Sequence, residues 1–229
     1  DTYGTNTKDA FVRLFPTFNM PYKVLETIAY DPAARDLSAE IRKAKATGAE
    51  LAMVLSRVND AILLTQEMVK QRWHPMGIVA PGNPGLYEDQ FYKSLGKLSE
   101  YCISNVPWFD PKAELAKRIE KAFDKQNPKD KMMFHVLNVG YTFEALMIAA
   151  DAFKRARSSD AKTLTAAIRQ TDIKNRMMLG GAIKFNAKGQ VEGNASACIQ
   201  NLNLRPTVVL PASAATAKPV FPVPDYKKA

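Results

Sequence analysis

The side chains best suited to recognise a small solute lie in loops that follow predicted strands. Arg57 and Asn59 come directly after the apolar run 51–55, and Asn83 follows the next predicted strand, 77–80. An arginine can bind a carboxylate through two parallel hydrogen bonds, whereas an asparagine can hydrogen-bond a ligand or cap a helix. Because ligands of open α/β sheets bind at the carboxyl ends of the strands, we expect these loops to contribute to a binding site.

No pattern typical of an enzyme or a metal centre accompanies these residues. The sequence contains no nucleophile elbow, phosphate-binding loop or dinucleotide fingerprint. Neither His74 nor His135 has a Cys, Asp or Glu partner at the spacing of a metal site or a catalytic triad. Cys102 and Cys198 lie in strand-like segments, where they can be buried free thiols or form one disulfide in an oxidising compartment. We therefore favour a binding protein without cofactor or metal over an α/β enzyme.

Charge and composition exclude some classes of partner. The 229 residues carry 32 Lys and Arg against 23 Asp and Glu, a net charge of +9, and 46% of them are hydrophobic. The basic residues are scattered among acidic ones on the polar faces of predicted helices, which argues against a nucleic-acid partner but leaves a field that attracts small anions. No run approaches the ~20 consecutive apolar residues that span a bilayer, so the sequence predicts a soluble globular chain.

The first half of the chain alternates between predicted helices and strands. A helix at 6–15 precedes a strand at 22–30, and a helix that Ser38 caps runs to Ala46 before Gly48. The later predicted elements are a strand at 51–55, a helix capped by Asn59 or Asp60, a strand at 77–80, a helix at 87–95 and a strand at 100–106. This order predicts right-handed crossovers and a parallel sheet, hence a doubly wound α/β lobe.

The pattern changes after Pro107. Three helices follow, at 112–126, about 131–156 and 159–170. Alternating residues around an Asn-Ala-Lys-Gly turn predict a β-hairpin within 180–191. Strands at 197–202 and 207–210 then precede a Pro-rich segment, 211–224, that we expect to be extended.

The opening residues resemble a strand-to-helix turn whose strand is missing. Residues 1–5 are small, turn-forming or capping types, and Ala10, Phe11, Leu14 and Phe15 follow at helical spacing. A helix with such an apolar stripe needs a sheet to cover it, so we expect an upstream part of the fold to be absent from this chain.

The order of these features resembles the periplasmic solute-binding proteins of the leucine/isoleucine/valine-binding type, which have the type I periplasmic-binding-protein fold. The resemblance rests on the opening DTYGT, on GYTFEALMIAADAF in the long helix, and on FNAKGQ followed by a strand and VVLP. It extends over nearly the whole chain. It implies two doubly wound lobes, joined by three crossing segments, that close on a ligand by a hinge motion.

The resemblance also implies an organisation and partners. Residues 1–107 would form the second, C-terminal lobe, 108–196 the later part of the first lobe, and 197–229 the return crossing and the tail. The partners would be a small ligand and ABC permease subunits, and the location periplasmic or extracytoplasmic. The helices at 112–170 would stay poorly covered unless a complementary N-terminal segment or another copy packs on them. A ligand-sensing receptor of the same fold is the alternative.

Within this family, the resemblance gives five residues a ligand-binding role. Tyr3 would cover the ligand with its ring and donate a hydrogen bond, Arg57 and Asn59 would follow in the next loop, and Asn83 in the third; Tyr141 would face the hinge from the long helix. Each has a structural alternative: packing under a turn for Tyr3, solvation for Arg57, a helix cap for Asn59 and a core position for Tyr141.

The third loop departs from the amino-acid binders that this chain resembles. Many of them place a glutamate after the position of Pro81, where it pairs with the ligand ammonium; here the loop continues Gly82, Asn83, Pro84, Gly85. An ammonium buried without a charge partner loses several kcal/mol. This loop therefore predicts that small organic acids, aromatic acids or amide-like solutes bind better than leucine.

Overall fold

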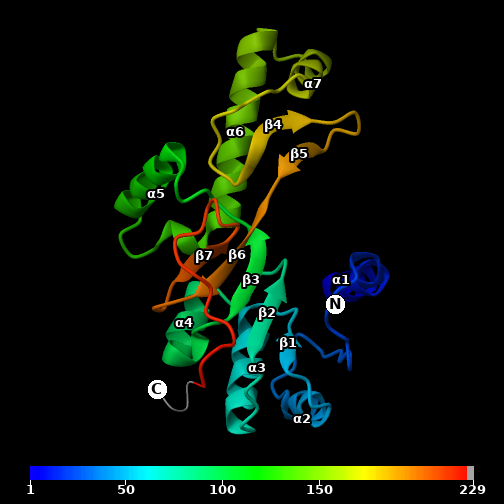
Figure 1. Cartoon of the computed structure of the whole chain (residues 1–229). Coiled ribbons are helices and arrows are strands. Elements are labelled where there is room, and N and C mark those ends of the chain that lie inside the picture. The colour runs from blue at the N-terminus through cyan, green and yellow to red at the C-terminus, as the bar shows by residue number, and fades with distance from the viewer. Residues whose placement is uncertain (226–229) are drawn as a thin grey trace. The chain divides into compact units, whose positions relative to one another are not determined.

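The structure is a computed structural model that describes residues 1–225. Its strands form a five-stranded sheet in the order β1-β2-β3-β6-β7 and a two-stranded sheet of β4 and β5 (Figure 1). The chain divides into two compact units. Unit 1 contains residues 1–104, 201–205 and the described residues from Val220 onward, and unit 2 contains residues 105–200 and 206–219.

Unit 1 alternates helices and strands, as the sequence predicts. Its helices are α1 (Thr2–Leu14), α2 (Ser38–Ala46), α3 (Val58–Lys70) and α4 (Asp89–Leu95), with 3-10 turns at Phe15–Phe18 and Gly96–Ser99. Its strands are β1 (Leu51–Met53), β2 (Gly77–Pro81) and the start of β3 (Ile103–Pro107). Strands β1 and β2 pair in parallel, with Leu51 opposite Gly77. The parallel pairing confirms the predicted strand–helix–strand crossover.

The core of unit 1 fixes the ends of these strands. Helix α3 buries Ala61, Leu64 and Met68, which recur at the spacing of one helical face. They join a buried cluster that includes Ile78 of β2 and Phe91 of α4. Full burial of one such large apolar side chain stabilises the fold by about 1.5–3 kcal/mol, so the core holds the carboxyl ends of β1 and β2 in defined positions.

The strand predicted at 22–30 is wrong. Among the described residues, this segment forms no helix and belongs to no sheet. Val24 and Leu25 are more than half exposed, and the segment is anchored instead by the Tyr30 hydroxyl. A run of β-preferring residues becomes a strand only when a neighbour pairs with it, and β1 is the edge strand of the sheet here.

The predicted starts of α1 and α2 also need correction. Helix α1 begins at Thr2 and not at residue 6, because the Asp1 carboxylate accepts the Gly4 N–H and caps the helix there. Helix α2 spans the predicted residues, but its N-cap is Leu37, and Ser38 is the first helical residue. The N–H of Ser38 has no partner within the helix, and it donates to the Asp36 carboxylate instead.

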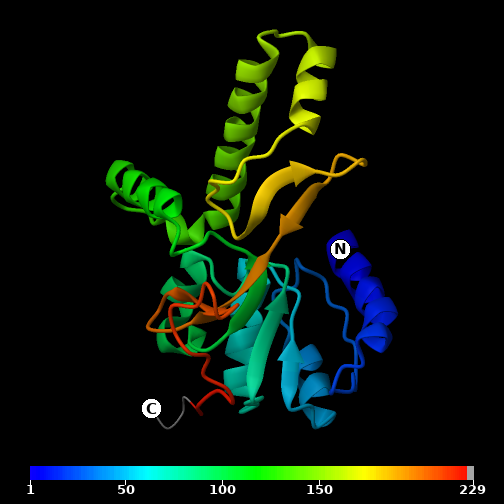
Figure 2. The ribbon, with the colours of Figure 1, turned by 45° about the horizontal axis from the view of Figure 1, so that its top comes forward.

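Unit 2 contains three helices and the hairpin. Its elements are α5 (Glu114–Gln126), α6 (Val136–Ala156), α7 (Ala161–Arg169), β4 (Gly180–Phe185), β5 (Val191–Asn194), β7 (Pro206–Leu210) and most of β6 (Ser196–Asn201), with a 3-10 turn at Met132–Phe134. Strands β4 and β5 are antiparallel, with Lys184 opposite Glu192, which confirms the predicted hairpin. Helices α6 and α7 pack side by side (Figure 2). Cys102 in unit 1 and Cys198 in unit 2 are free thiols.

A buried ion pair joins α6 to the segment before β4. Arg176 donates to both carboxylate oxygens of Glu144, at 3.1 and 2.7 Å, and the Met177 and Met178 N–H groups donate to the same carboxylate at 3.0 and 2.7 Å. The remaining Arg176 donors reach the Gly181 carbonyl and the Asn194 side chain. Each charge is therefore fully hydrogen-bonded, the condition under which a buried pair is tolerated.

Helix α6 has an uncovered apolar face. Among the described residues it is the one helix whose length and composition would suit a membrane span, a property that core helices of soluble proteins share. Only 22% of its most apolar stretch is buried, and Leu146 and Phe153 are 65% and 54% exposed. Contiguous exposed apolar surface of this kind marks a contact surface.

Candidate functional site

The loops that follow β1 and β2 lie against each other. A Cβ atom at Gly85 would lie 2.4 Å from the Ser56 carbonyl oxygen and 2.9 Å from the Arg57 carbonyl carbon, so only glycine allows this approach. The Asn83 side chain donates a hydrogen bond of 3.3 Å to the Val54 carbonyl. The parallel pairing of β1 and β2 thus places both loops at the same edge of the sheet.

Asp60 and Tyr30 hold the backbone at Arg57 in place. Arg57 is the N-cap of α3, and its N–H donates to the Asp60 carboxylate at 2.8 Å. The Tyr30 hydroxyl is hydrogen-bonded to the other Asp60 oxygen at 2.5 Å and to the Leu55 carbonyl at 2.7 Å. Burial, followed by the hydrogen bond to and the charge of Asp60, raises the pKa of Tyr30 far above its usual value. The phenol therefore stays protonated and holds this loop at ordinary pH.

The Arg57 side chain, in contrast, is 74% exposed. Its Nη2 atom lies 3.1 Å from Oδ2 of Asp1, while Oδ1 of Asp1 accepts the Gly4 N–H at 2.9 Å. Two residues on, the Tyr3 hydroxyl donates to the Gly82 carbonyl at 2.6 Å. The first turn of α1 therefore places a carboxylate beside Arg57 and an aromatic ring beside the 82–85 loop.

The structure brings three of the predicted site residues together in unit 1. Tyr3, Arg57 and Asn83 contact the same pair of loops, but Asn83 is 3% exposed and serves as a tie to β1. Asn59 is exposed in the first turn of α3, and the prediction that Asn59 or Asp60 caps this helix is wrong, because Arg57 is the N-cap and Asp60, three residues later, accepts the Arg57 N–H. Tyr141 lies on α6 in unit 2, 43% exposed, where partial burial raises its pKa.

Two buried polar atoms of these loops lack partners among the described residues. They are the Ser56 hydroxyl and the Asn83 side-chain carbonyl oxygen, on residues that are 5% and 3% exposed. A buried polar atom without a hydrogen bond costs about 1–3 kcal/mol. A water or a ligand that reached these atoms would complete their hydrogen bonding, which is consistent with a binding site at these loops.

The sequence analysis missed Asp1 and Tyr30. Asp1 acts on a residue 56 positions away, so no local pattern could have paired it with Arg57. Asp60, the partner of Tyr30, did have a local signal: it lies three residues after the N-cap Arg57, where an acidic side chain can accept the N–H of the N-cap residue. Tyr30 had no such signal, because the segment around it had been predicted to be a strand.

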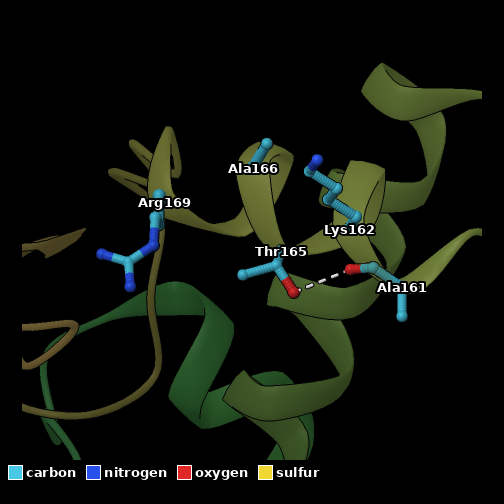
Figure 3. A pocket seen from close by; sticks show the side chains of 5 residues that line it. All are labelled: Ala161, Lys162, Thr165, Ala166 and Arg169. Carbon is cyan, nitrogen blue, oxygen red and sulfur yellow. Dashed lines mark hydrogen bonds between the residues drawn. The ribbon is translucent and has the colours of Figure 1, made fainter.

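Two other hollows of the described surface are lined by different residues. One of ≈430 Å³ lies along α7, lined by Ala161, Lys162, Thr165, Ala166 and Arg169 (Figure 3). Its polar side chains are dispersed, and the Thr165 hydroxyl is used within the helix by donating to the Ala161 carbonyl. Another of ≈620 Å³ lies where Trp73 and Met76 meet Pro222. Within residues 1–225 no group of three or more His, Cys, Asp or Glu could hold a metal ion.

The chain matches the family of periplasmic binding proteins over residues 1–200, and it belongs to that family. Solved structures show the same fold. A leucine-binding protein, LivK, from Thermotoga maritima MSB8 is 16% identical with a TM-score of 0.72, and the match covers 88% of this chain and 54% of that one. A type 1 periplasmic binding protein from Bordetella pertussis Tohama I is 17% identical with a TM-score of 0.74, covering 91% and 58%.

A third structure has a named set of ligands. The leucine-, isoleucine-, valine-, threonine- and alanine-binding protein from Brucella ovis, in a closed conformation, is 13% identical with a TM-score of 0.65, covering 96% of this chain and 54% of that one. The chain thus spans little more than half the length of these structures. A comparison with curated protein sequences found no match.

These matches confirm the predicted family and the type I periplasmic-binding-protein fold. The matched family and the solved structures are described as binding proteins, which confirms the prediction of a binding protein over an enzyme. Identities of 12–17% show the fold alone. The ligand and the transport partner of this chain are therefore matters for proposal.

Proposed function

We propose that this chain is part of the extracytoplasmic solute-binding component of an ABC transporter, which captures a small ligand between two lobes by hinge closure. The observation that carries the proposal is the convergence of Tyr3 and Arg57 on the loops that follow β1 and β2. We assign residues 1–107 to the second lobe, 108–196 to the later part of the first, and 197–229 to the return crossing and tail, whose last four residues lie outside the described part.

We propose that the ligand carries a carboxylate and is either a branched-chain amino acid-like compound or a small organic or aromatic acid. The exposed guanidinium of Arg57 can bind a carboxylate through two hydrogen bonds. The ring of Tyr3 can cover an apolar ligand body. The net charge of +9 adds a field that draws anions toward the protein. The related structures named for leucine support the amino-acid class.

Calorimetry on the intact protein tests this proposal. A panel of branched-chain amino acids and small acids is titrated into the wild type and into Arg57→Ala, Tyr3→Ala and Arg35→Ala. Loss of one charge-assisted hydrogen bond weakens binding by roughly 10- to 100-fold, so Arg57→Ala should lose affinity. Tyr3→Ala should lose affinity to a smaller extent. Arg35 is exposed and serves as the matched control for loss of a positive charge. Equal affinity in all four proteins would contradict the site.

We further propose that the apolar face of α6 is covered in the working protein by a complementary N-terminal segment or by another copy of the chain. Its exposed Leu146 and Phe153 support this, as does the greater length of the related structures. Sedimentation of the 229-residue chain tests the idea. We expect self-association or co-purification with a complementary fragment, and a compact, stable monomer would contradict it.

A further inference from the structure

The 81–85 loop offers no acidic side chain, yet a carboxylate is present at the site. It belongs to Asp1, whose Oδ2 atom lies 3.1 Å from Nη2 of Arg57. We propose that Asp1 is a specificity-determining residue of the ligand site: beside Arg57, its carboxylate favours zwitterionic amino acids over ligands that carry a carboxylate alone. The proposal rests on the function proposed above and identifies which of its two ligand classes the site prefers.

Asp1 is held in place independently of Arg57. Its Oδ1 atom accepts the Gly4 N–H and its carbonyl accepts the Thr5 N–H, so the first turn of α1 fixes it. The turn is itself tied to the 82–85 loop through the Tyr3 hydroxyl and the Gly82 carbonyl. The negative charge therefore stays at the site when Arg57 turns toward a ligand.

Arg57 has donors to spare. A guanidinium carries five N–H donors, and among residues 1–225 the Arg57 side chain uses one of them, in its hydrogen bond to Asp1. A ligand carboxylate can thus bind a free edge of the guanidinium while Asp1 keeps Nη2. In that arrangement the ligand has a positive charge on one side and a negative charge close by.

The sign of the Asp1 charge then decides between ligand classes. A ligand with a carboxylate alone is attracted by Arg57 and repelled by Asp1. A zwitterion with the same carbon skeleton places an ammonium where Asp1 attracts it, so the carboxylate missing from the 81–85 loop is supplied by another element. The side chains of Asp1 and Arg57 are 37% and 74% exposed, so solvent screens the charge of Asp1. We therefore expect this charge to change the ratio of the two affinities by roughly five-fold.

A purely structural role for Asp1 makes a different prediction. If the carboxylate only caps α1, an asparagine replaces it without loss, since Asn and Asp are equally good N-caps. The variant Asp1→Asn therefore removes the charge and keeps the cap. Asp9→Asn is the matched control, because Asp9 is an exposed acid of the same helix whose ion pair is with Lys8.

The experiment measures the dissociation constants of leucine and 4-methylpentanoate, which differ by the ammonium group alone, for the intact wild type and both variants. We expect Asp1→Asn to shift the affinity ratio roughly five-fold toward 4-methylpentanoate, and the shift to shrink in high salt, whereas Asp9→Asn leaves the ratio in place. A ratio unmoved by Asp1→Asn, with Arg57→Ala still weakening both ligands, would overturn this inference and leave the proposed function standing. If neither the pair nor the wider panel binds the wild type, the proposed function fails and this inference fails with it.

Discussion

Units 1 and 2 each contain an ion pair between an arginine and an acidic residue, and the two pairs differ in nearly every physical respect. In unit 2, the side chains of Glu144 and Arg176 are each 6% exposed, and the carboxylate accepts four hydrogen bonds. In unit 1, the side chains of Asp1 and Arg57 are 37% and 74% exposed and share a single contact.

This difference separates a structural use of charge from a binding use. A buried pair that loses one partner leaves a desolvated charge behind, so separation of the two side chains is strongly unfavourable. An exposed pair is worth little in free energy and rearranges easily. Arg57 is thus available to a ligand because its present partner holds it weakly, whereas Arg176 is committed to the fold.

Removal of Glu144 should have the largest effect. Glu144→Ala leaves Arg176 buried without its partner and the Met177 and Met178 N–H groups without their acceptor. We expect a loss of about 3–5 kcal/mol in the free energy of unfolding, measured by urea titration. Asp151→Ala is the control on the same helix, since its exposed pair with Arg155 should contribute less than about 0.5 kcal/mol.

The double variant Glu144→Leu with Arg176→Met sharpens this test. Replacement of both charges removes the desolvation cost together with the attraction, so we expect it to be less destabilising than Glu144→Ala alone. A double variant that is the least stable of the set would show that the hydrogen bonds to the backbone outweigh the charges.

The close approach of the two site loops should be the next most sensitive feature. Gly85→Ala forces a methyl group against the backbone of Ser56 and Arg57, and we expect about 1–3 kcal/mol of destabilisation together with weaker ligand binding. Gly181→Ala is the control, because a Cβ there meets no atom within 4 Å. Ligand affinity unchanged in Gly85→Ala would contradict the site.

Loss of the Tyr30 hydroxyl should have a smaller effect that depends on pH. Tyr30→Phe removes the hydrogen bonds to Asp60 and Leu55, and we expect a loss of about 1–2 kcal/mol at neutral pH. The folded state raises the pKa of Tyr30, so this stabilisation is complete below the unfolded value of about 10 and declines as the pH rises further. The difference between the wild type and Tyr30→Phe should therefore shrink in alkaline urea titrations. A stability difference that stays constant as the pH rises would contradict the role assigned to the protonated Tyr30 hydroxyl.

Asp1→Asn should have the smallest effect on stability. The asparagine keeps the α1 cap, and the exposed pair with Arg57 contributes about 0.2–1 kcal/mol, so the melting temperature should fall slightly in low salt and not at all in high salt. A loss as large as that of Glu144→Ala would show that the two ion pairs are alike, and the comparison would fail.

The sequence predicted best what local signals specify. The helix 38–46, the 180–191 hairpin and the two loops after β1 and β2 each follow from nearby capping, turn or apolar residues, and the structure has them at or near the predicted positions. The strand at 22–30 failed because pairing depends on a partner far away in the chain.

The site was predictable in its positions and not in its contacts. Arg57 and Asn83 could be placed from the strands that precede them. The ion pair between Asp1 and Arg57 could not, because it depends on how α1 packs over loops more than 50 residues later. The orphaned polar atoms of Ser56 and Asn83 follow from loop geometry that no residue pattern encodes.

Each unit contains one free cysteine that a thiol reagent can modify. Burial raises the pKa of the Cys102 thiol to about 12, with the Glu100 charge acting in the same direction, and the side chain is 3% exposed in unit 1. The thiolate is the form of cysteine that attacks an alkylating reagent, so the buried Cys102 thiol stays unmodified until unit 1 opens. Cys198 lies half-buried in unit 2. A mass spectrum after brief alkylation therefore records the opening of unit 1 through Cys102 and the accessibility of β6 through Cys198, residue by residue, without any engineered probe.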